Sequence, residues 1–389
     1  MTIVAALQRE VVRRGRLALG EVAWRSGLSR AARRTWLLGG FVGAAFGDNA
    51  AALFRHVRQH RPDIAATWVI DRRAVDADAA GMVGPVLSHD GIDAAAAAFA
   101  ADVLVVSHGL HDLPGFASSR VKGLRVRLGH GLTALKKTKP PPGRRQADVA
   151  RLFQLVPVAS PFERENKRQW GIDDDALVIC GVCRFDDLLT RARVRPPERR
   201  VVYMPTWRDW LHGAAIESDA GAQALLKLLL HPDLNAGLRA RDVHLDVYFH
   251  RLYDRAWRER LRRAGGSHLH LVDVDSDVQG LLARSQALLT DYSSVVWDML
   301  YLDRPVIFFA PDVDAYEKHR GAYFDLRSDL PGPVARTADD AVELLFSTID
   351  GGFPLSADAR TWQSRAFAFR DDQNCARVVR AIEAALGRR

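Results

Sequence analysis

The chain has 389 residues, of which 48% are hydrophobic, and this length and composition are typical of a globular protein with two domains of moderate size. Lys and Arg (55) outnumber Asp and Glu (47), and the net charge of +8 favours acidic partners: nucleotides, phosphorylated polymers, anionic membranes or nucleic acid. The three cysteines cannot form an even disulfide framework, and Cys180 and Cys183 lack the second pair that zinc would need, so we expect buried, reduced thiols.

No run of eighteen uncharged apolar residues predicts a transmembrane helix, and the amino terminus lacks the pattern of a secretory signal. We therefore expect a cytoplasmic protein. Residues 1–36 form a basic, amphipathic segment with helical spacing, in which Trp24 lies among the apolar positions. Two interpretations are open: a helix in the interface of an anionic membrane, or a helix packed on its own domain with its arginines in water. The arginines are Arg9, Arg13, Arg14, Arg16, Arg25, Arg30, Arg33 and Arg34.

Residues 37–170 alternate apolar runs with helical segments, as doubly wound α/β domains do. The segment Gly47-Asp48-Asn49 predicts a turn into a helix that continues through Val57. A stiff basic loop without regular structure is predicted around three consecutive prolines. Strands are predicted at residues 36–44, 66–70, 103–107 and 124–128.

A second α/β series is predicted over residues 171–372, and a final helix at residues 373–389 is expected to cross back toward the first domain. Its strands are predicted at residues 178–183, 201–205, 243–250, 269–272, 287–290 and 306–310. The overall prediction is an α/β fold of two doubly wound, Rossmann-like domains.

One segment of the second series has the pattern of a phosphate site. An apolar strand is followed by Asp291, Ser293 and Ser294 at the start of a predicted helix. Serine hydroxyls and the first free N–H groups of that helix would converge on an anion, helped by the helix dipole. Ordinary capping of a core helix by Ser or Asp is the alternative interpretation.

A candidate general base follows a strand of the first series. His130 lies between two glycines, which allow the backbone to approach a ligand, and an imidazole can accept a proton near neutral pH. Lysines that can bind a negatively charged group follow within seven residues. His108 has a similar Ser-His-Gly context without such lysines and ranks second. The flanking residues are Gly129, Gly131, Lys136 and Lys137.

Two arginines at predicted strand ends are candidates for binding phosphate oxygens. Arg208 follows a strand in the segment Pro205–Asp209, together with Thr206, whose hydroxyl can donate a hydrogen bond. Arg184 follows another strand. For Arg208 the alternative is a surface pair with Asp209 on a connecting loop.

In these motifs the chain resembles the CDP-glycerol glycerophosphotransferases, that is, the teichoic acid primases and polymerases and their capsule-synthesis relatives. Their order and spacing extend the resemblance over nearly the whole chain beyond residue 40. The motifs that carry it are HG and LKK within His130–Lys137, G-x-x-R-x-D at Gly181–Asp186, PTWRD at Pro205–Asp209, and TDYSS with the following RPVIFF and DAY within Thr290–Tyr316.

The resemblance implies a GT-B arrangement in which two Rossmann-like domains face a central cleft. It implies transfer of a polyol phosphate, with glycerol phosphate as the favoured group, from a CDP-activated donor to an acceptor hydroxyl. CMP would be released, and the product would belong to a teichoic acid-like or capsular polymer. No cofactor is required, and a role for Mg²⁺ is left open. The implied partners are the CDP-polyol, a lipid-linked or glycan acceptor, and an anionic membrane at whose inner face the protein would be peripheral.

By match of motif, the second domain binds the donor phosphates and His130 of the first domain deprotonates the acceptor. Gly131, Lys136 and Lys137 are assigned to the acceptor side. The donor-side residues are Arg184, Thr206, Arg208, His250, Asp291, Ser293 and Ser294.

The chain departs from the family pattern at three positions. His250 is followed by Arg251 where the family has proline, Gly129 replaces an aromatic residue, and Ala134 replaces a proline. Acceptor recognition is therefore expected to differ, and the role of His250 is open between a donor contact and a core histidine at a strand end.

Two other functions remain open on the sequence. A GT-B glycosyltransferase would also need a basic cleft and an imidazole base, and fold alone does not exclude it. A non-enzymatic scaffold at the membrane surface would use the arginine-rich helix. Nucleic acid is not expected as a partner, because no sheet segment interleaves aromatic and basic residues.

Overall fold

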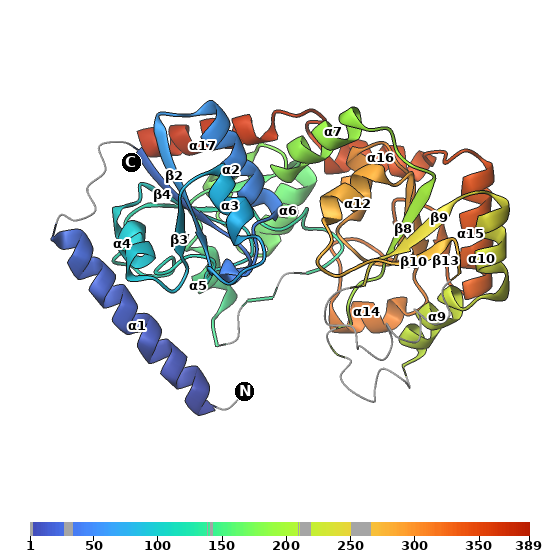
Figure 1. The fold of residues 1–389 in the computed structure, drawn as a ribbon, viewed down its shortest axis with the longest axis horizontal. Helices are drawn as coiled ribbons and strands as arrows, with labels where there is room; N and C mark the ends of the chain where they lie inside the picture. The colour runs from blue at the N-terminus through green and yellow to red at the C-terminus, as the bar shows by residue number, and fades with distance from the viewer. Residues whose placement is uncertain are drawn as a thin grey trace. The chain divides into compact units, whose positions relative to one another are not determined.

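The computed structural model describes residues 3–26, 34–137, 139–140, 143–208, 210, 219–249 and 266–389 (Figure 1). The chain divides into two compact units. Unit 1 comprises Met1–Leu132, Lys139–Asp187 and Asp371–Arg389, and unit 2 comprises Thr133–Thr138 and Leu188–Arg370.

Unit 1 is built on a parallel sheet of five strands whose spatial order reverses between β1 and β4. In such a sheet the carboxyl ends of the two strands at the reversal flank a crevice where ligands bind. In spatial order the strands are β3 (Val86–Ser88), β2 (Ile64–Ile70), β1 (Arg34–Gly39), β4 (Val103–Val106) and β5 (Leu124–Arg127).

Both faces of this sheet are covered, because alternate residues of one strand belong to different apolar clusters. Trp36 and Leu38 of β1 pack in one cluster, whereas Leu37 between them packs in the other. This explains why the strands appear in the sequence as continuous apolar runs. The other elements of the unit are α1 (Ile3–Arg25), η1 (Phe41–Gly43), α2 (Asp48–His60), α3 (Ala77–Val83), α4 (Ile92–Ala100), α5 (Gln146–Ala150), α6 (Pro161–Gln169), η2 (Asp174–Ala176), the paired strands β6 (Val156–Val158) and β7 (Leu177–Ile179), and α17 (Asn374–Gly387).

The first strand is shorter than predicted. β1 ends at Gly39, because Phe41 and Val42 have φ angles of 50° and 54° and lie in a 3₁₀ turn. A strand cannot continue through left-handed residues. The prediction of a strand to residue 44 is therefore wrong, since an apolar run does not reveal a local reversal of φ.

Unit 2 contains a parallel sheet of six strands, and its chain order also reverses once, between β8 and β11. In spatial order the strands are β10 (Leu269–Leu271), β9 (His244–Val247), β8 (Arg200–Met204), β11 (Ala287–Thr290), β12 (Val306–Phe309) and β13 (Val334–Ala335). The helices are α9 (Ala220–Leu229), α10 (Pro232–Ala240), α12 (Val278–Arg284), α13 (Val296–Tyr301), α14 (Val313–His319), α15 (Ala338–Asp350) and α16 (Ala357–Ala366).

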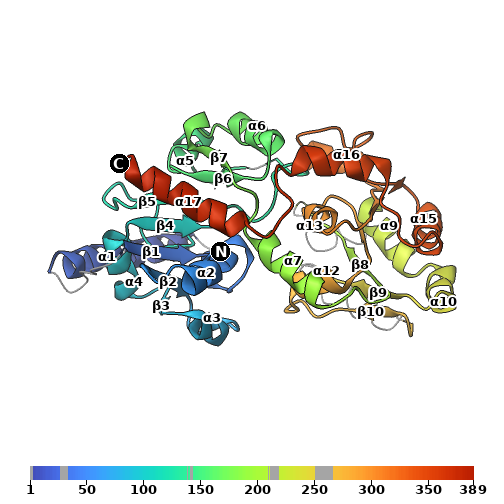
Figure 2. The ribbon, with the colours of Figure 1, turned by 90° about the horizontal axis from the view of Figure 1, so that it is seen from above.

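The division between the units falls at Asp187, within α7 (Arg184–Val194), rather than at the predicted residue 170. The reason is that β7 pairs with β6 of unit 1, and the backbone N–H of Arg184 donates to Asn49 of the same unit. The last helix, α17, also belongs to unit 1, where it packs on α2 and β5 (Figure 2).

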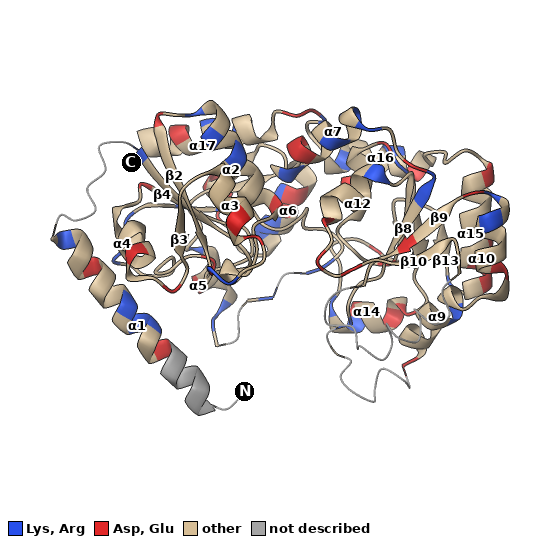
Figure 3. Ribbon diagram, in the orientation of Figure 1, with Lys and Arg blue, Asp and Glu red and all other residues tan. Residues whose placement is uncertain are grey.

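The amino-terminal helix α1 packs on α4 of its own unit. Gly20 makes the close approach possible, because a Cβ atom there would lie 2.6 Å from that of Ala95. Trp24 stacks on Phe99 with the ring centroids 6.0 Å apart. Basic positions recur along the helix (Figure 3). Among the helices of the described residues, none combines the length and the apolar character needed to span a bilayer.

Each unit is thus a doubly wound parallel domain, and the predicted α/β fold of two Rossmann-like domains is confirmed. The three cysteines are free and buried, as predicted. In unit 1 the carboxyl ends of β4 and β5 carry His108 and His130. In unit 2 the strands beside the chain reversal, β8 and β11, carry at their carboxyl ends Thr206, Arg208, Asp291, Ser293 and Ser294.

Candidate functional site

Unit 1 brings two imidazoles together at the carboxyl ends of β4 and β5. The rings of His108 and His130 stack with centroids 5.2 Å apart and an interplanar angle of 11°. His130 is exposed, whereas His108 is partly buried and its Nε2 lies 3.4 Å from a carboxylate oxygen of Asp48. The outer ring is therefore open to a ligand and the inner ring is held by the protein.

The backbone around His130 takes a form that requires glycine. Gly129 and Gly131 have φ angles of 74° and 149°, which L side chains rarely adopt. Asn49 fixes this loop from α2, because its Nδ2 donates to the carbonyl of Gly129 at 2.9 Å while its Oδ1 accepts from the backbone N–H of Arg184. The glycines on either side of the histidine thus serve a specific backbone shape.

Arg184 was predicted to bind donor phosphate in the second domain, but it lies in unit 1. Its guanidinium is buried and donates to Asp48 at 2.9 Å, and Asp48 in turn faces His108. The residue therefore holds the carboxylate that orients His108. The placement was missed because the strand before it, β7, belongs to unit 1.

The electrostatics of the imidazole pair favour neutral rings. Desolvation, followed by the positive charge of His108, lowers the pKa of His130. The His130 ring also keeps exposed surface. Burial also lowers the pKa of His108, although Asp48 opposes the effect. A neutral His130 has a lone pair with which to accept a proton near pH 7.

Unit 2 holds a buried charge network at the carboxyl ends of β8, β11 and β12. Arg208, which is 2% exposed, donates to both oxygens of Asp312 at 2.8 Å and to Asp291 at 2.6 Å. Thr206 donates its hydroxyl and its N–H to the other oxygen of Asp291. Three strand ends are thereby tied together around one guanidinium.

This geometry differs from the predicted direct contact of Arg208 with phosphate. The guanidinium faces two carboxylates and lies over the rings of Tyr292 and Tyr316 at 5.3 and 5.9 Å, so its surface is covered by protein. Asp291 is likewise fully buried. Thr206, Arg208 and Asp291 do lie together as predicted, but they hold the loops at the strand ends in place.

The hydroxyls that remain open at this edge are those of Ser293 and Ser294. Both residues are partly exposed, directly after the buried Asp291 and Tyr292, and they precede α13. Within the described residues their side chains make no hydrogen bond to protein. Arg336 follows β13 at the same edge, and its Nη1 donates to the carbonyl of Ala310 at 2.7 Å. Two hydroxyls and one cation are thus available here to an anionic ligand.

The two lysines assigned to the acceptor side belong to unit 2 rather than to the first domain. The segment Thr133–Thr138 packs there, with the N–H of Lys137 donating to the carbonyl of Gly321 at 3.0 Å. Both lysines are exposed. Gly131 stays in unit 1, and His250 lies outside the described residues.

Lys167 of α6 was not singled out from the sequence. Its side chain is buried, and its Nζ lies 3.9 Å from the ideal Cβ position of Gly129 and 3.8 Å from Glu163. Burial lowers the pKa of Lys167 to about 8, with Glu163 opposing the shift. Helical spacing in a strongly polar segment does not distinguish such a lysine from one on a solvated face.

The described residues contain one cluster with the spacing of metal ligands: Asp242, His244 and His268. It lies in unit 2 at the amino-terminal ends of β9 and β10, the edge of the sheet opposite to Ser293 and Ser294. The motif residues themselves supply imidazole, hydroxyl and cationic groups suited to phosphate and proton transfer.

The sequence model of the CDP-glycerol:poly(glycerophosphate) glycerophosphotransferases matches residues 28–384, and the chain belongs to this family. It is 29% identical over 202 residues to the teichoic acid glycerol-phosphate transferase of Staphylococcus aureus (strain NCTC 8325 / PS 47), covering 51% of this chain and 48% of that protein. It is 41% identical over 83 residues to the teichoic acid poly(glycerol phosphate) polymerase of Bacillus subtilis (strain 168), covering 21% and 11%. The chain thus spans less than half of the length of these relatives.

Solved structures share the fold, and the predicted GT-B-like class is confirmed. The wall teichoic acid polymerase TagF superposes with a TM-score of 0.72 at 18% identity, covering 99% of this chain and 97% of that one. A putative UDP-N-acetylglucosamine 2-epimerase from Listeria monocytogenes gives a TM-score of 0.62 at 15% identity, covering 92% and 98%.

Proposed function

We propose that the protein transfers a polyol phosphate, most simply glycerol phosphate, from a CDP-activated donor to an acceptor hydroxyl in the synthesis of a teichoic acid-like or capsular polymer. The observation that carries the proposal is membership of the glycerophosphotransferase family over residues 28–384. The names of its relatives include both glycerol-phosphate and ribitol-phosphate enzymes, which supports a polyol phosphate and leaves the polyol to experiment.

The carboxyl-terminal edge of the sheet in unit 2 is the proposed donor site. Ser293 and Ser294 would donate their hydroxyls to the diphosphate, and Arg336 would offset its charge. The buried network of Arg208, Asp291 and Thr206 would hold the serines in place. Support comes from the open serine side chains at the chain reversal of a Rossmann-type sheet.

In the proposed reaction His130 accepts the proton of the acceptor hydroxyl. The hydroxyl oxygen forms a bond to the distal phosphorus of the donor, the bond from that phosphorus to the bridging oxygen breaks, and CMP leaves with the electron pair. The products are a phosphodiester and CMP. Enzymes accelerate phosphoryl transfer chiefly by positioning the reactants and by stabilising charge on the phosphate oxygens. A neutral, exposed imidazole on a fixed loop supports the role of His130.

The nucleotide product tests this proposal. The purified protein is incubated with CDP-glycerol, CDP-ribitol or a sugar nucleotide, each with a synthetic lipid-linked acceptor, and the released nucleotide is identified by chromatography. We expect CMP with one of the CDP-polyols and a phosphodiester in the product. Release of a nucleoside diphosphate from the sugar nucleotide, with no reaction of either CDP-polyol, would instead identify a glycosyltransferase. Addition of EDTA or Mg²⁺ in parallel tests metal dependence.

We further propose that α1 binds an anionic membrane surface at the cytoplasmic face, where a lipid-linked acceptor would lie. The side chains of Val11, Leu19 and Val22 are 69%, 55% and 64% exposed and fall on one face, opposite the face that packs on α4. Exposed arginines flank this apolar face, Arg14 on one edge and Arg16 on the other. Such a helix suits the interface of an anionic bilayer.

Vesicle sedimentation tests the membrane proposal. We expect the protein to sediment with vesicles containing phosphatidylglycerol and to remain in solution with pure phosphatidylcholine. The double variant Val11→Asp, Val22→Asp should lose sedimentation. Val75→Asp changes an 86% exposed apolar residue outside α1 and is the matched control. Equal sedimentation of both variants would contradict a role for the α1 face.

A further inference from the structure

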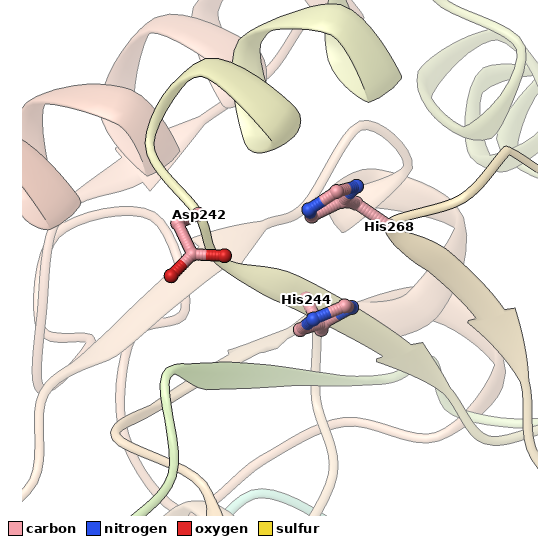
Figure 4. Close-up of side chains that lie close together, drawn as sticks. All are labelled: Asp242, His244 and His268. Atoms are coloured by element: carbon pink, nitrogen blue, oxygen red, sulfur yellow. The ribbon is translucent and has the colours of Figure 1, made fainter.

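A cluster of imidazoles lies in unit 2, at the edge of the sheet opposite to the proposed donor site. Asp242 precedes β9, His244 begins β9, and His268 precedes β10 (Figure 4). One ligand atom of each residue lies within 4.8 Å of those of the other two. The cluster takes no part in the proposed transfer reaction.

The strand register explains why these residues meet. β9 and β10 are parallel neighbours in which Leu245 pairs with Leu269, so His244 and His268 are adjacent across the two strands. Their rings stack with centroids 4.6 Å apart and an interplanar angle of 7°. Asp242 has a φ of 50° in the turn before β9, and its carboxylate lies beside the two rings.

Each imidazole has one nitrogen engaged by a neighbour and one left for a ligand. The Nδ1 of His244 lies 2.8 Å from the Nε2 of His270, and the Nδ1 of His268 lies 2.9 Å from the hydroxyl of Ser267. When each ring carries its proton on Nδ1, the Nε2 lone pairs are free. Metal-binding histidines in proteins are held in this manner, with the second nitrogen donating to an outer group.

Two stacked imidazoles beside an exposed carboxylate provide two nitrogen ligands and one oxygen ligand. Zinc and related divalent ions of the first transition series prefer this type of ligand set.

We propose that Asp242, His244 and His268 bind one divalent transition-metal ion of the zinc type, with His270 and Ser267 orienting the two imidazoles. Bonds of about 2.0–2.1 Å require ligand atoms roughly 3.3 Å apart, so the site closes slightly around the ion. Asp242, 82% exposed, has the freedom to move. The bound ion would join the turn before β9 to the start of β10, and thus stabilises unit 2 rather than entering the reaction.

Direct metal binding tests the proposal without substrate. Protein lacking a histidine tag is stripped with EDTA, equilibrated with ZnCl₂, desalted and assayed for zinc by mass spectrometry. We expect one equivalent in the wild type, visible absorption bands when CoCl₂ replaces zinc, and a higher melting temperature with either ion.

Substitutions identify the ligands. The double variant His244→Ala, His268→Ala should retain no zinc, and Asp242→Asn should bind at least tenfold more weakly. His270→Ala should weaken binding about 10- to 100-fold through the orientation of His244. The control is His60→Ala, which removes one ring of the close pair with His56 on α2, and should retain a full equivalent.

Three outcomes would overturn the proposal: a wild type that retains no zinc after desalting, a double variant that retains a full equivalent, or Asp242→Asn with unchanged affinity and melting response. Because Asp242 is exposed, that last variant should fold normally, and it remains informative if the double variant is unstable. CMP release by zinc-free protein would be unaffected, so the metal site and the transfer reaction can fail independently.

Discussion

At the scale of single residues, the open imidazole of His130 is the group best suited to accept a proton. We predict that His130→Ala lowers turnover by about 10²- to 10⁴-fold, the usual contribution of a general base. Donor affinity should persist, because the proposed donor residues belong to unit 2. Product assays and calorimetric titration with a CDP-polyol measure the two effects. Loss of donor binding with unchanged residual turnover would contradict the assigned role, and His60→Ala serves as control.

The pH dependence follows from the direction of the pKa shift of His130. A base works when it is unprotonated, and a lowered pKa keeps His130 unprotonated below its ordinary value of 6.5. Turnover should therefore be nearly constant from pH 8 down to 6.5 and fall only at lower pH. A rate profile measured with saturating donor tests this. A fall that begins at or above pH 7 would show that the ring is not desolvated in the working enzyme.

Substitution of Arg208 should chiefly lower the stability of unit 2, because the side chain is buried in a charge network and does not face open space. Arg208→Ala leaves the carboxylates of Asp291 and Asp312 buried without their cation, which typically costs about 3–5 kcal/mol. We expect a corresponding loss in the free energy of unfolding measured in urea. Arg195→Ala, in which a 78% exposed side chain is removed, is the control. An unchanged unfolding midpoint together with weaker donor binding would contradict this structural role and support the direct phosphate contact predicted from the sequence.

Most residues of the sequence motifs lie at the carboxyl-terminal edges of the two sheets, but the contacts of these residues were not predictable. Motif spacing placed Thr206, Arg208 and Asp291 near one another, as the structure shows. It did not show that Asp312, which follows β12, accepts hydrogen bonds from the guanidinium of Arg208. Pairing of charges between distant strands depends on sheet order, which a local motif does not contain.

At the scale of elements, apolar runs predicted most strands of both sheets because both sheets are buried on two faces. The short strands β3, β6 and β13 were missed, since two or three residues are too few to show a pattern. One of the two interpretations of α1, packing on its own domain, is confirmed by its contact with α4. The opposite face carries exposed valines and leucine, and its binding to a membrane stays a prediction.

The contact between α1 and α4 depends on Gly20. A larger residue would bring its Cβ within 2.6 Å of the Cβ of Ala95, both in helical backbone that cannot move locally. We predict that Gly20→Leu displaces α1 at a cost of about 1–3 kcal/mol. Gly15→Leu adds the same side chain where nothing lies within 4 Å, and is the control. Protease cleavage of α1 should be faster only in the Gly20 variant, and equal rates would contradict tight packing.

At the scale of the whole molecule, the alternation of strands and helices predicted two Rossmann-type units but misplaced their division. Arg184 and the strand β7 before it belong to unit 1, and Lys136 and Lys137 belong to unit 2. The chain passes between the units more than once, and only tertiary contacts show at which residue. The return of the last helix toward the first domain was predicted from the pattern of strands and helices along the chain, and its packing in unit 1 supplies a test.

The packing of α17 implies that unit 1 cannot fold without the end of the chain. Val378, Val379 and Ile382 are buried in the apolar cluster that includes Trp36, and Asn374 donates to Asp186 at 2.6 Å. Burying three such side chains contributes roughly 5–9 kcal/mol, comparable to the whole stability of a domain. Deletion of residues 371–389 should therefore unfold unit 1 while unit 2 stays folded. Limited proteolysis with mass spectrometry would show this as rapid cleavage confined to unit 1. Deletion of residues 388–389 alone, past the end of α17, should leave both units resistant, and resistance of unit 1 in the longer deletion would refute the dependence.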